Sequence, residues 1–327
     1  MKSEAGLEQV VTIVEKIRGA LARRIVGQVQ VVDDLLSCFF SGGHCLLIGV
    51  PGLAKTTLIQ SLAGCLHLQF NRIQFTPDLM PSDITGSEIL FEERTTGMRE
   101  FRFIKGPVFS NIVLADEINR TPPKTQSALL QAMQEGQVTS SGQTHPLPKP
   151  FWVLATQNPI EQEGTYPLPE AQLDRFMFSI EMDYPDYEAE LEIVRSTTSA
   201  PLQPIEPVCT LEEMEQLRLL VTRIPVADSV IASAVQLVRA TRPANASCPE
   251  KIKNLITWGA GPRASQNLIL ASKAYAILDG RPTPDVSDIR RAAYPVLRHR
   301  LVRSFHAEVD NINQNRIIDL LIEAVLP

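Results

Sequence analysis

Short apolar runs alternate with amphipathic segments over the first 185 residues of the chain. Four runs have the length and composition of buried parallel strands, and polar residues or glycine follow each of them: residues 44–48, 112–115, 151–155 and 176–180. Apolar residues at helical spacing occupy segments around them, for example residues 1–24, 55–66 and 124–135. This alternation predicts an α/β fold in which helices cover both faces of a parallel sheet. Ligands of such sheets bind beyond the carboxyl ends of the strands.

Two segments do not fit simple strand–helix alternation. The first, near residues 88–104, has a turn sequence at residues 95–97, followed by Phe101 and Phe103 at strand spacing. The second, residues 136–147, has a turn sequence at Ser141-Gly142. Both patterns predict β-hairpins, and we expect them to project from the sheet rather than to join it.

The pattern changes after Tyr184-Pro185. A helical segment leads into the Pro-rich stretch SAPLQPIEPVCT, and from about residue 210 onward the apolar spacing is that of helices only. A chain of 327 residues is long enough for two domains. We therefore predict an α/β core over residues 1–185, with the two hairpins as inserts, and a smaller all-helical domain over residues 186–327.

Composition narrows the class of protein. The net charge of −6, from 37 acidic and 31 basic residues, argues against a dedicated nucleic-acid binder and gives no indication of a membrane-surface protein. No apolar run approaches the roughly 18 residues of a transmembrane helix, and the N-terminus lacks the layout of a signal peptide. The five cysteines form no CxxC pair, so we expect buried, reduced thiols in a cytoplasmic protein.

The stretch GVPGLAKTT after the first predicted strand has the composition of a phosphate-binding loop. Such a loop needs glycines for its turn, a helix N-terminus facing the anion, and a lysine that reaches the β- and γ-phosphates. The usual pattern is GxxxxGK[ST], and here alanine takes the second glycine position. Alanine fits a helical backbone there, but it would be unfavourable if the position required a positive φ. The expected nucleotide contacts are Gly49, Val50, Pro51, Gly52, Leu53, Ala54, Lys55, Thr56 and Thr57.

Polar residues at the ends of two later strands complete a hydrolytic set. Asp116 could hold a magnesium-bound water while Thr56 supplies a hydroxyl ligand, and Glu117 could orient or deprotonate the attacking water. Asn158 could bind that water or the γ-phosphate. The structural alternatives are a solvated acid pair in a loop and an asparagine that forms a turn before Pro159.

Two arginines and one N-terminal segment are further candidates. Arg175, in LPEAQLDRF, could stabilise charge on the transferred phosphoryl group; a salt bridge to a nearby acid is the alternative. Arg263, in GAGPRAS, could reach the γ-phosphate from the second domain, or it could form an ordinary salt bridge at a helix start. The adenine pocket could be lined by Ile25, Val26, Gly27 and Gln28, of which the first two could equally be core residues.

Together these segments resemble the AAA+ ATPases, and specifically the MoxR family, over nearly the whole chain. The matching motifs are IVGQ at 25–28, GVPGLAKT at 49–56, LADEINR at 114–120, ATQNP at 155–159, LPEAQLDRF at 168–176 and GPRAS at 261–265. The family characteristically carries alanine before the lysine of the loop. The resemblance implies Walker A at 49–56, Walker B at Asp116 and Glu117, sensor 1 at Asn158, an arginine finger at Arg175 and sensor 2 at Arg263.

The resemblance also implies an AAA+ core with a helical lid, Mg²⁺-dependent hydrolysis of ATP, and a homo-oligomeric ring, commonly a hexamer. Arg175 would then act on the neighbouring subunit's ATP, whereas Arg263 could act in either subunit. MoxR relatives are thought to remodel or mature protein complexes or insert metal cofactors, often with partners that bear von Willebrand factor A domains.

A nucleic-acid motor of the helicase-like branch and a chelatase-type subunit are the alternatives. The predicted turn around Ser141-Gly142 lacks the positive charge that tracking a phosphate backbone requires, so we do not expect nucleic acid as a partner.

Overall fold

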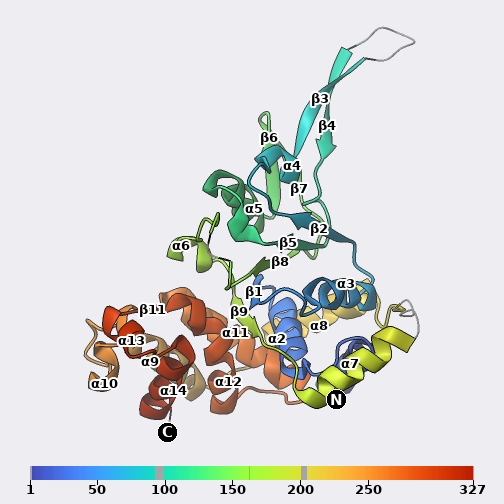
Figure 1. Ribbon diagram of the computed structural model, residues 1–327. Coiled ribbons are helices and arrows are strands. Elements are labelled where there is room, and N and C mark those ends of the chain that lie inside the picture. The colour runs from blue at the N-terminus through green and yellow to red at the C-terminus, as the bar shows by residue number, and fades with distance from the viewer. Residues whose placement is uncertain (1, 93–98, 162, 200–204, 327) are drawn as a thin grey trace.

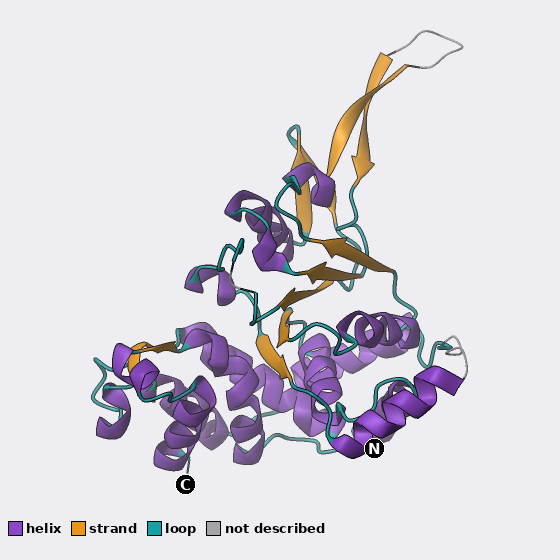
Figure 2. Ribbon diagram, in the orientation of Figure 1, coloured by secondary structure: helices purple, strands orange, loops and turns teal. Residues whose placement is uncertain are grey.

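A five-stranded parallel sheet forms the centre of the computed structural model, which describes residues 2–92, 99–161, 163–199 and 205–326 (Figures 1 and 2). The strands lie in the order β2-β5-β8-β1-β9, and every neighbouring pair is parallel. Their bounds are β1 Cys45–Gly49, β2 Phe70–Gln74, β5 Ile112–Asp116, β8 Trp152–Gln157 and β9 Phe178–Met182. Four of the five are the predicted apolar runs, which confirms the predicted α/β fold.

The strand that the hydrophobic pattern did not predict is β2. It lies at the edge of the sheet, pairs only with β5, and buries a single side chain, that of Ile73. An edge strand with one covered position has a polar sequence, here FNRIQ, and apolar periodicity cannot distinguish it from a loop.

Successive side chains of the strands point into two different hydrophobic clusters. Leu47 and Leu154 face a cluster that includes α1 (Lys2–Ala22), α2 (Val29–Phe40) and α3 (Lys55–Cys65). Leu46 and Val153 face a second cluster on the opposite side, formed with α4 (Pro81–Thr85) and α5 (Pro123–Glu135). The sheet is therefore covered on both faces, as its continuous apolar strands require.

Both predicted hairpins are present. β3 (Gly86–Glu92) and β4 (Arg99–Lys105) pair over seven positions and project far from the body of the molecule (Figure 1); the predicted turn at 95–97 lies outside the described residues. β6 (Gln137–Ser140) and β7 (Gln143–Pro146) join through the predicted turn at residues 141–142. The two hairpins touch, because the ring of Phe103 stacks on that of His145 with centroids 4.0 Å apart.

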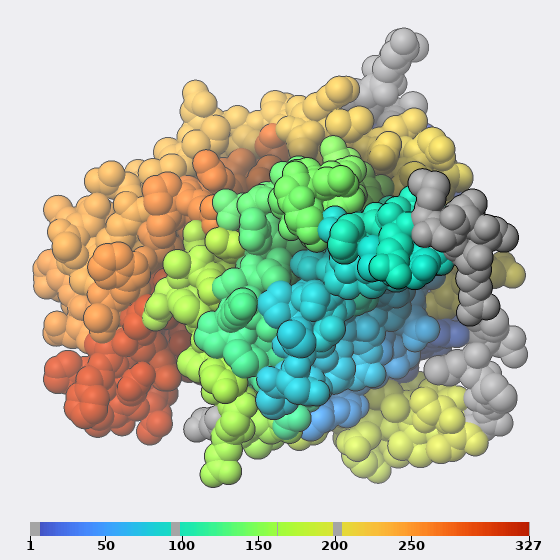
Figure 3. Space-filling view, turned by 90° about the horizontal axis from the view of Figure 1, so that it is seen from above, coloured from blue at the N-terminus to red at the C-terminus, as the bar shows by residue number. Residues whose placement is uncertain are grey.

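The C-terminal part is mostly helical, as predicted, and its later residues, orange to red in Figure 3, lie toward one end of the molecule. One exception is a short antiparallel pair of β10 and β11, whose three and two residues are too few to give a recognisable apolar pattern. The predicted domain boundary at 185/186 stays a prediction. The remaining elements are η1 Ile118–Arg120, α6 Glu170–Leu173, α7 Tyr187–Ser199, α8 Leu211–Arg223, α9 Asp228–Ala240, α10 Glu250–Lys253, β10 Ile256–Trp258, α11 Pro262–Leu278, α12 Val286–Leu297, η2 Arg298–Arg300, β11 Val302–Arg303, α13 Phe305–Val309 and α14 Gln314–Val325.

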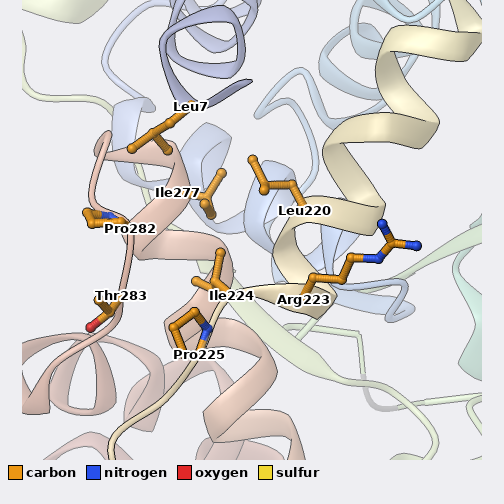
Figure 4. A pocket seen from close by; sticks show the side chains of 8 residues that line it. All are labelled: Leu7, Leu220, Arg223, Ile224, Pro225, Ile277, Pro282 and Thr283. Atoms are coloured by element: carbon orange, nitrogen blue, oxygen red, sulfur yellow. The ribbon is translucent and has the colours of Figure 1, made fainter. Parts of the chain in front are cut away.

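One hydrophobic cluster runs without interruption from the sheet face into the C-terminal helices. Its margin holds a small cavity of about 330 Å³ between α1, α8 and α11. In Figure 4, Leu7, Leu220 and Ile277 surround this cavity, whereas the guanidinium of Arg223 points away from it. The N-terminal helix is therefore packed against helices that lie more than two hundred residues later in the chain.

The five cysteines are free and buried, in agreement with the prediction. Within the described ranges, no individual helix has both the length and the apolar character needed to cross a membrane. Helices α8 and α9 meet those criteria only as a pair, and they are bent by 85° at the break between them.

Candidate functional site

The strand order brings three predicted loops to one edge of the sheet. Strand β8 lies between β1 and β5, so the carboxyl ends of these strands are adjacent. A cavity of about 380 Å³ opens at that edge. One residue that was not predicted, Arg72, lines this cavity. The other lining residues are nine of the predicted ones: Pro51, Gly52, Ala54, Lys55, Thr56, Thr57, Asp116, Glu117 and Asn158.

The loop before α3 turns through two left-handed residues. Gly52 has φ +89° and Ala54 has φ 55° and ψ 26°. Of the two possibilities that the sequence left open, the position has the positive φ, and Ala54 occupies a conformation that is unfavourable for an L-residue with a Cβ atom. Left-handed residues alternating with others turn successive N–H groups toward one side, which suits an anion.

The first turn of α3 has free backbone donors at the cavity. No side chain caps the helix at Ala54, so the N–H groups of its first residues have no intrahelical or side-chain acceptor. Lys55 Nζ donates to the carbonyl oxygen of Gly49 at 2.5 Å, which holds the ammonium over the loop. Partial burial lowers the pKa of Lys55, and the charges of Asp116 and Glu117 oppose that shift.

A buried hydroxyl fixes the two acids. Thr156, at the end of β8, is fully buried, and its Oγ1 donates to Asp116 Oδ1 at 2.6 Å. The same Oγ1 accepts the backbone N–H of Glu117 at 2.8 Å. Thr156 was part of the ATQNP motif but was assigned no role in the sequence analysis. Its position follows from the pairing of β5 with β8, which the motif alone does not give.

Glu117 has a strained backbone. Its φ of 57° and ψ of 50° place it in the left-handed region, which is unusual for this residue type and is found disproportionately at functional sites. Its carboxylate accepts a hydrogen bond from Gln74 Nε2 at 3.1 Å and lies 3.3 Å from Arg120 Nε. These contacts orient the carboxylate while about a quarter of the side chain stays exposed at the cavity.

Arg72 comes from the unpredicted strand β2. Its Nε and Nη2 donate to Asp116 Oδ2 at 3.0 and 2.6 Å, and Nη2 also donates to Gln74 Oε1 at 2.7 Å. Strand β2 therefore contacts both acids, Asp116 through Arg72 and Glu117 through Gln74. No sequence motif marks these residues, and only the parallel pairing of β2 with β5 places them here.

Asn158 is almost fully buried at the cavity. Its Oδ1 accepts the backbone N–H of Ile160 at 3.1 Å. This contact is the turn-forming arrangement expected of an asparagine before proline, and it leaves the amide NH₂ group as the available donor. The structural and the functional interpretation are therefore compatible.

The proposed adenine segment does not line the cavity. Ile25 belongs to the main hydrophobic cluster, Gln28 Nε2 donates to the carbonyl oxygen of Asp183 at 3.0 Å, and Gly27 packs against Ala189 of α7. The same holds for three loop residues. Gly49 packs against the end of β9, and the lining includes neither Val50 nor Leu53, the latter of which packs on the core.

Neither predicted arginine lines the loop cavity. Arg175 Nη1 donates to the carbonyl oxygen of Leu130 at 2.8 Å, beside a separate cavity of about 290 Å³ along α5. Arg263 Nη1 lies 3.3 Å from Asp174 Oδ2 and donates to the carbonyl oxygen of the same residue at 3.2 Å. The salt bridge that was the alternative for Arg263 is thus formed, with the residue next to Arg175 in the chain.

The segment that carries Arg175 is held by three consecutive side chains of η2, and we call this arrangement the 174–179 clamp. Arg298, His299 and Arg300 all contact backbone carbonyl oxygens of residues 174–179, at distances from 2.7 to 3.1 Å. Arg300, only 3 % exposed, also donates from Nε to a carboxylate oxygen of Asp174 at 2.8 Å. The C-terminal helices are therefore fastened to the backbone around Arg175.

The donor set fits a magnesium nucleotide. Over the described ranges, no cluster of three or more histidine, cysteine or acidic side chains could hold a metal by itself. Mg²⁺ does not need such a cluster, because it binds through one or two carboxylates, waters and substrate phosphates. Thr56 and Asp116 line the cavity beside Lys55 and the uncapped start of α3, and these groups match a cation with its phosphates.

Comparisons with known proteins identify the family. Residues 44–178 match the family model described as the ATPase family associated with various cellular activities (AAA), and residues 250–320 match the AAA lid domain. Chaperone MoxR1 of Mycobacterium tuberculosis is 41% identical over 98% of this chain and 84% of its own length. The uncharacterized protein YeaC of Bacillus subtilis is 42% identical over 93% of this chain and 91% of its own length.

A solved structure extends the similarity to the whole fold. The crystal structure of a candidate ATPase from Cytophaga hutchinsonii has a TM-score of 0.91 and 41% identity, and the match covers 99% of this chain and 97% of that one. Protein MoxR of Methylorubrum extorquens is 27% identical over 93% of this chain. The matching AAA and lid models and the 41% identity to a MoxR protein over nearly all residues show that the chain belongs to the MoxR family of AAA+ ATPases.

Proposed function

We propose that the chain is the ATP-hydrolysing subunit of a Mg²⁺-dependent motor that remodels or matures protein complexes. One observation carries the hydrolytic part of the proposal. A single cavity is lined by the lysine of the loop, the two acids and the sensor asparagine, which come from three adjacent strand ends. These are the groups that phosphoryl transfer requires for positioning and for charge stabilisation.

Each side chain has a role that its position allows. Lys55 would neutralise the β- and γ-phosphates, and Glu117 would orient and deprotonate the attacking water. The amide of Asn158 would donate to that water or to the γ-phosphate. When bound, Mg²⁺ supplies positive charge to the phosphate oxygens, and Thr56 and Asp116 would hold it.

Two substitutions test the assignment through separate readouts. Glu117→Gln keeps the size and hydrogen-bonding capacity of the side chain but removes the base, so turnover should fall by about 10²-fold or more while ATP affinity changes little. Lys55→Ala should abolish measurable ATP binding. The matched control is Glu192→Gln on the exposed face of α7, which makes the same charge change at the surface. Equal turnover of Glu117→Gln and the control would remove Glu117 from the mechanism.

The assembly is part of the same proposal. Arg175 does not line the loop cavity of its own chain, which supports a role at a neighbouring subunit's nucleotide in a homo-oligomeric ring. A hexamer, a cytoplasmic location and partners with von Willebrand factor A domains remain predictions from the resemblance. The relative from Mycobacterium tuberculosis is named a chaperone, which supports protein clients over the insertion of a metal cofactor.

The hairpin charges do not favour a nucleic-acid motor. Arginines on the described strands of the long hairpin are paired with acids, for example Arg99 with Glu92 at 3.2 Å, and Arg102 with Glu100. A hairpin that follows a phosphate backbone needs unneutralised positive charge. Salt-dependent binding of single-stranded DNA by the full chain would reverse this conclusion.

A further inference from the structure

Arg72 donates to one carboxylate oxygen of Asp116, the acid that is predicted to bind the metal. Two of its nitrogens contact the same atom, Asp116 Oδ2, at 2.6 and 3.0 Å, and the other carboxylate oxygen accepts the Thr156 hydroxyl. The partners differ in exposure: the Asp116 side chain is 14% exposed and that of Arg72 is 48% exposed. The arginine can therefore leave this contact toward solvent, whereas the acid stays at the cavity.

The side chains that line the cavity are balanced in charge when Arg72 is included; Arg120 contacts Glu117 from outside the lining, and its charge is matched by that of Glu161. The ionisable side chains that line it are Lys55, Arg72, Asp116 and Glu117, which are two cations and two anions. A divalent cation held by Asp116 would share this carboxylate with the guanidinium, and like charges at close range repel each other. Arg72 and the cation therefore compete for the same carboxylate, that of Asp116.

A purely structural role would be to fasten the edge strand. Strand β2 is already paired with β5 at five consecutive positions, from Phe70 to Gln74. Its single buried side chain, Ile73, lies in the hydrophobic cluster on one face of the sheet. The backbone pairing and the core contact of Ile73 are therefore enough to hold the strand in the sheet. The Arg72 side chain instead contacts a carboxylate at the cavity, that of Asp116.

From this geometry we propose that Arg72 is a specificity-determining residue for the metal form of the nucleotide. Its guanidinium competes with the divalent cation for Asp116, and it supplies positive charge to a nucleotide that enters without the cation. Arg72 therefore sets how strongly nucleotide binding depends on Mg²⁺. This inference rests on the proposed function, because it requires that the cavity binds a nucleotide.

The test measures binding rather than turnover. A fluorescent ADP analogue is titrated into the full-length wild type and Arg72→Gln, once in EDTA and once over a series of MgCl₂ concentrations. Arg72→Gln should bind the cation-free nucleotide about tenfold more weakly, and its half-saturating Mg²⁺ concentration should fall about tenfold, because one unit charge beside a divalent cation is removed. Arg72→Lys keeps the positive charge but loses the two-nitrogen contact of the guanidinium. Its affinity for the nucleotide and its half-saturating Mg²⁺ concentration should therefore lie between those of the wild type and Arg72→Gln.

The controls separate this inference from the proposed function. Arg99→Gln removes one paired arginine from the hairpin, away from the cavity, and should match the wild type in both titrations. A loss of affinity of equal size with and without Mg²⁺ in Arg72→Gln would show a merely structural role and overturn the inference. If the wild type itself binds no nucleotide and Lys55→Ala behaves identically, the proposed function fails instead.

Discussion

The left-handed backbone of Ala54 makes a stability prediction that runs against the usual effect of glycine. An L-residue in this region is disfavoured by about 1–2 kcal/mol, and Ala54→Gly removes that strain. Glycine loses more backbone freedom on folding, which offsets about 0.5–1 kcal/mol of the gain. The free energy of unfolding should therefore rise by about 0.5–1 kcal/mol. With an unfolding entropy near 0.7 kcal/mol/K for a chain of 327 residues, Tm should rise by about 1 °C.

The loop contains its own matched control. Gly52 has φ +89°, and a Cβ atom built on it would meet no atom within 4 Å. Gly52→Ala therefore adds backbone strain without a steric clash, and Tm should fall by about 1 °C. Scanning calorimetry of the two variants should give shifts of opposite sign, about 2 °C apart. A lower Tm for Ala54→Gly, with nucleotide binding retained, would refute the argument from strain.

Two further predictions concern acid stability and the proposed ring. Desolvation lowers the pKa of His44 to about 4 and raises that of Asp34 to about 6. The histidine therefore contributes stability above its unfolded pKa that is lost as pH falls through 6.5 toward 4, whereas Asp34 contributes stability at low pH that is lost as pH rises through about 6. As pH falls from 7 to 5, the histidine lowers the free energy of unfolding by about 2 kcal/mol and Asp34 raises it by about 1 kcal/mol. Over the same pH change, Asp34→Asn should therefore lose about 1 kcal/mol more of its free energy of unfolding than the wild type, as measured by urea titrations at the two pH values. An equal loss in the variant and the wild type would contradict the assignment. Lys55→Ala and Arg175→Ala should each be inactive alone and regain ATPase activity when mixed. In the mixture the Lys55→Ala subunit supplies the arginine and the Arg175→Ala subunit supplies the intact loop. Absence of recovery in co-assembled subunits would place Arg175 in its own chain's site.

The fold was predictable where burial makes the sequence distinctive. Strands β1, β5, β8 and β9 are covered on both faces, so they appear as continuous apolar runs. Strand β2 buries only Ile73 and was not predicted. The short pair β10·β11 was missed for a related reason, because two or three residues cannot show a period.

The candidate site divides in the same way. Its loop residues, acids and asparagine were predicted because their side-chain types and spacing follow from phosphate and metal chemistry. Arg72 and Thr156 became visible only through strand pairing, since each acts on a residue of another strand. The backbone angle of Ala54 could not be read from the sequence either, because alanine adopts the helical conformation in most settings.

The 174–179 clamp has a consequence for sequence variation. Apart from the carboxylate of Asp174, the groups that the clamp residues contact are backbone carbonyl oxygens, which every residue possesses. The clamp itself therefore constrains the length of the segment rather than its side chains, which are constrained instead by the burial of Phe176 and Phe178 in the core and by the proposed role of Arg175. An inserted residue would move the carbonyl oxygens that follow it out of reach of their arginine or histidine. In proteins that share this lid, insertions and deletions should be excluded from the segment even where its exposed side chains differ.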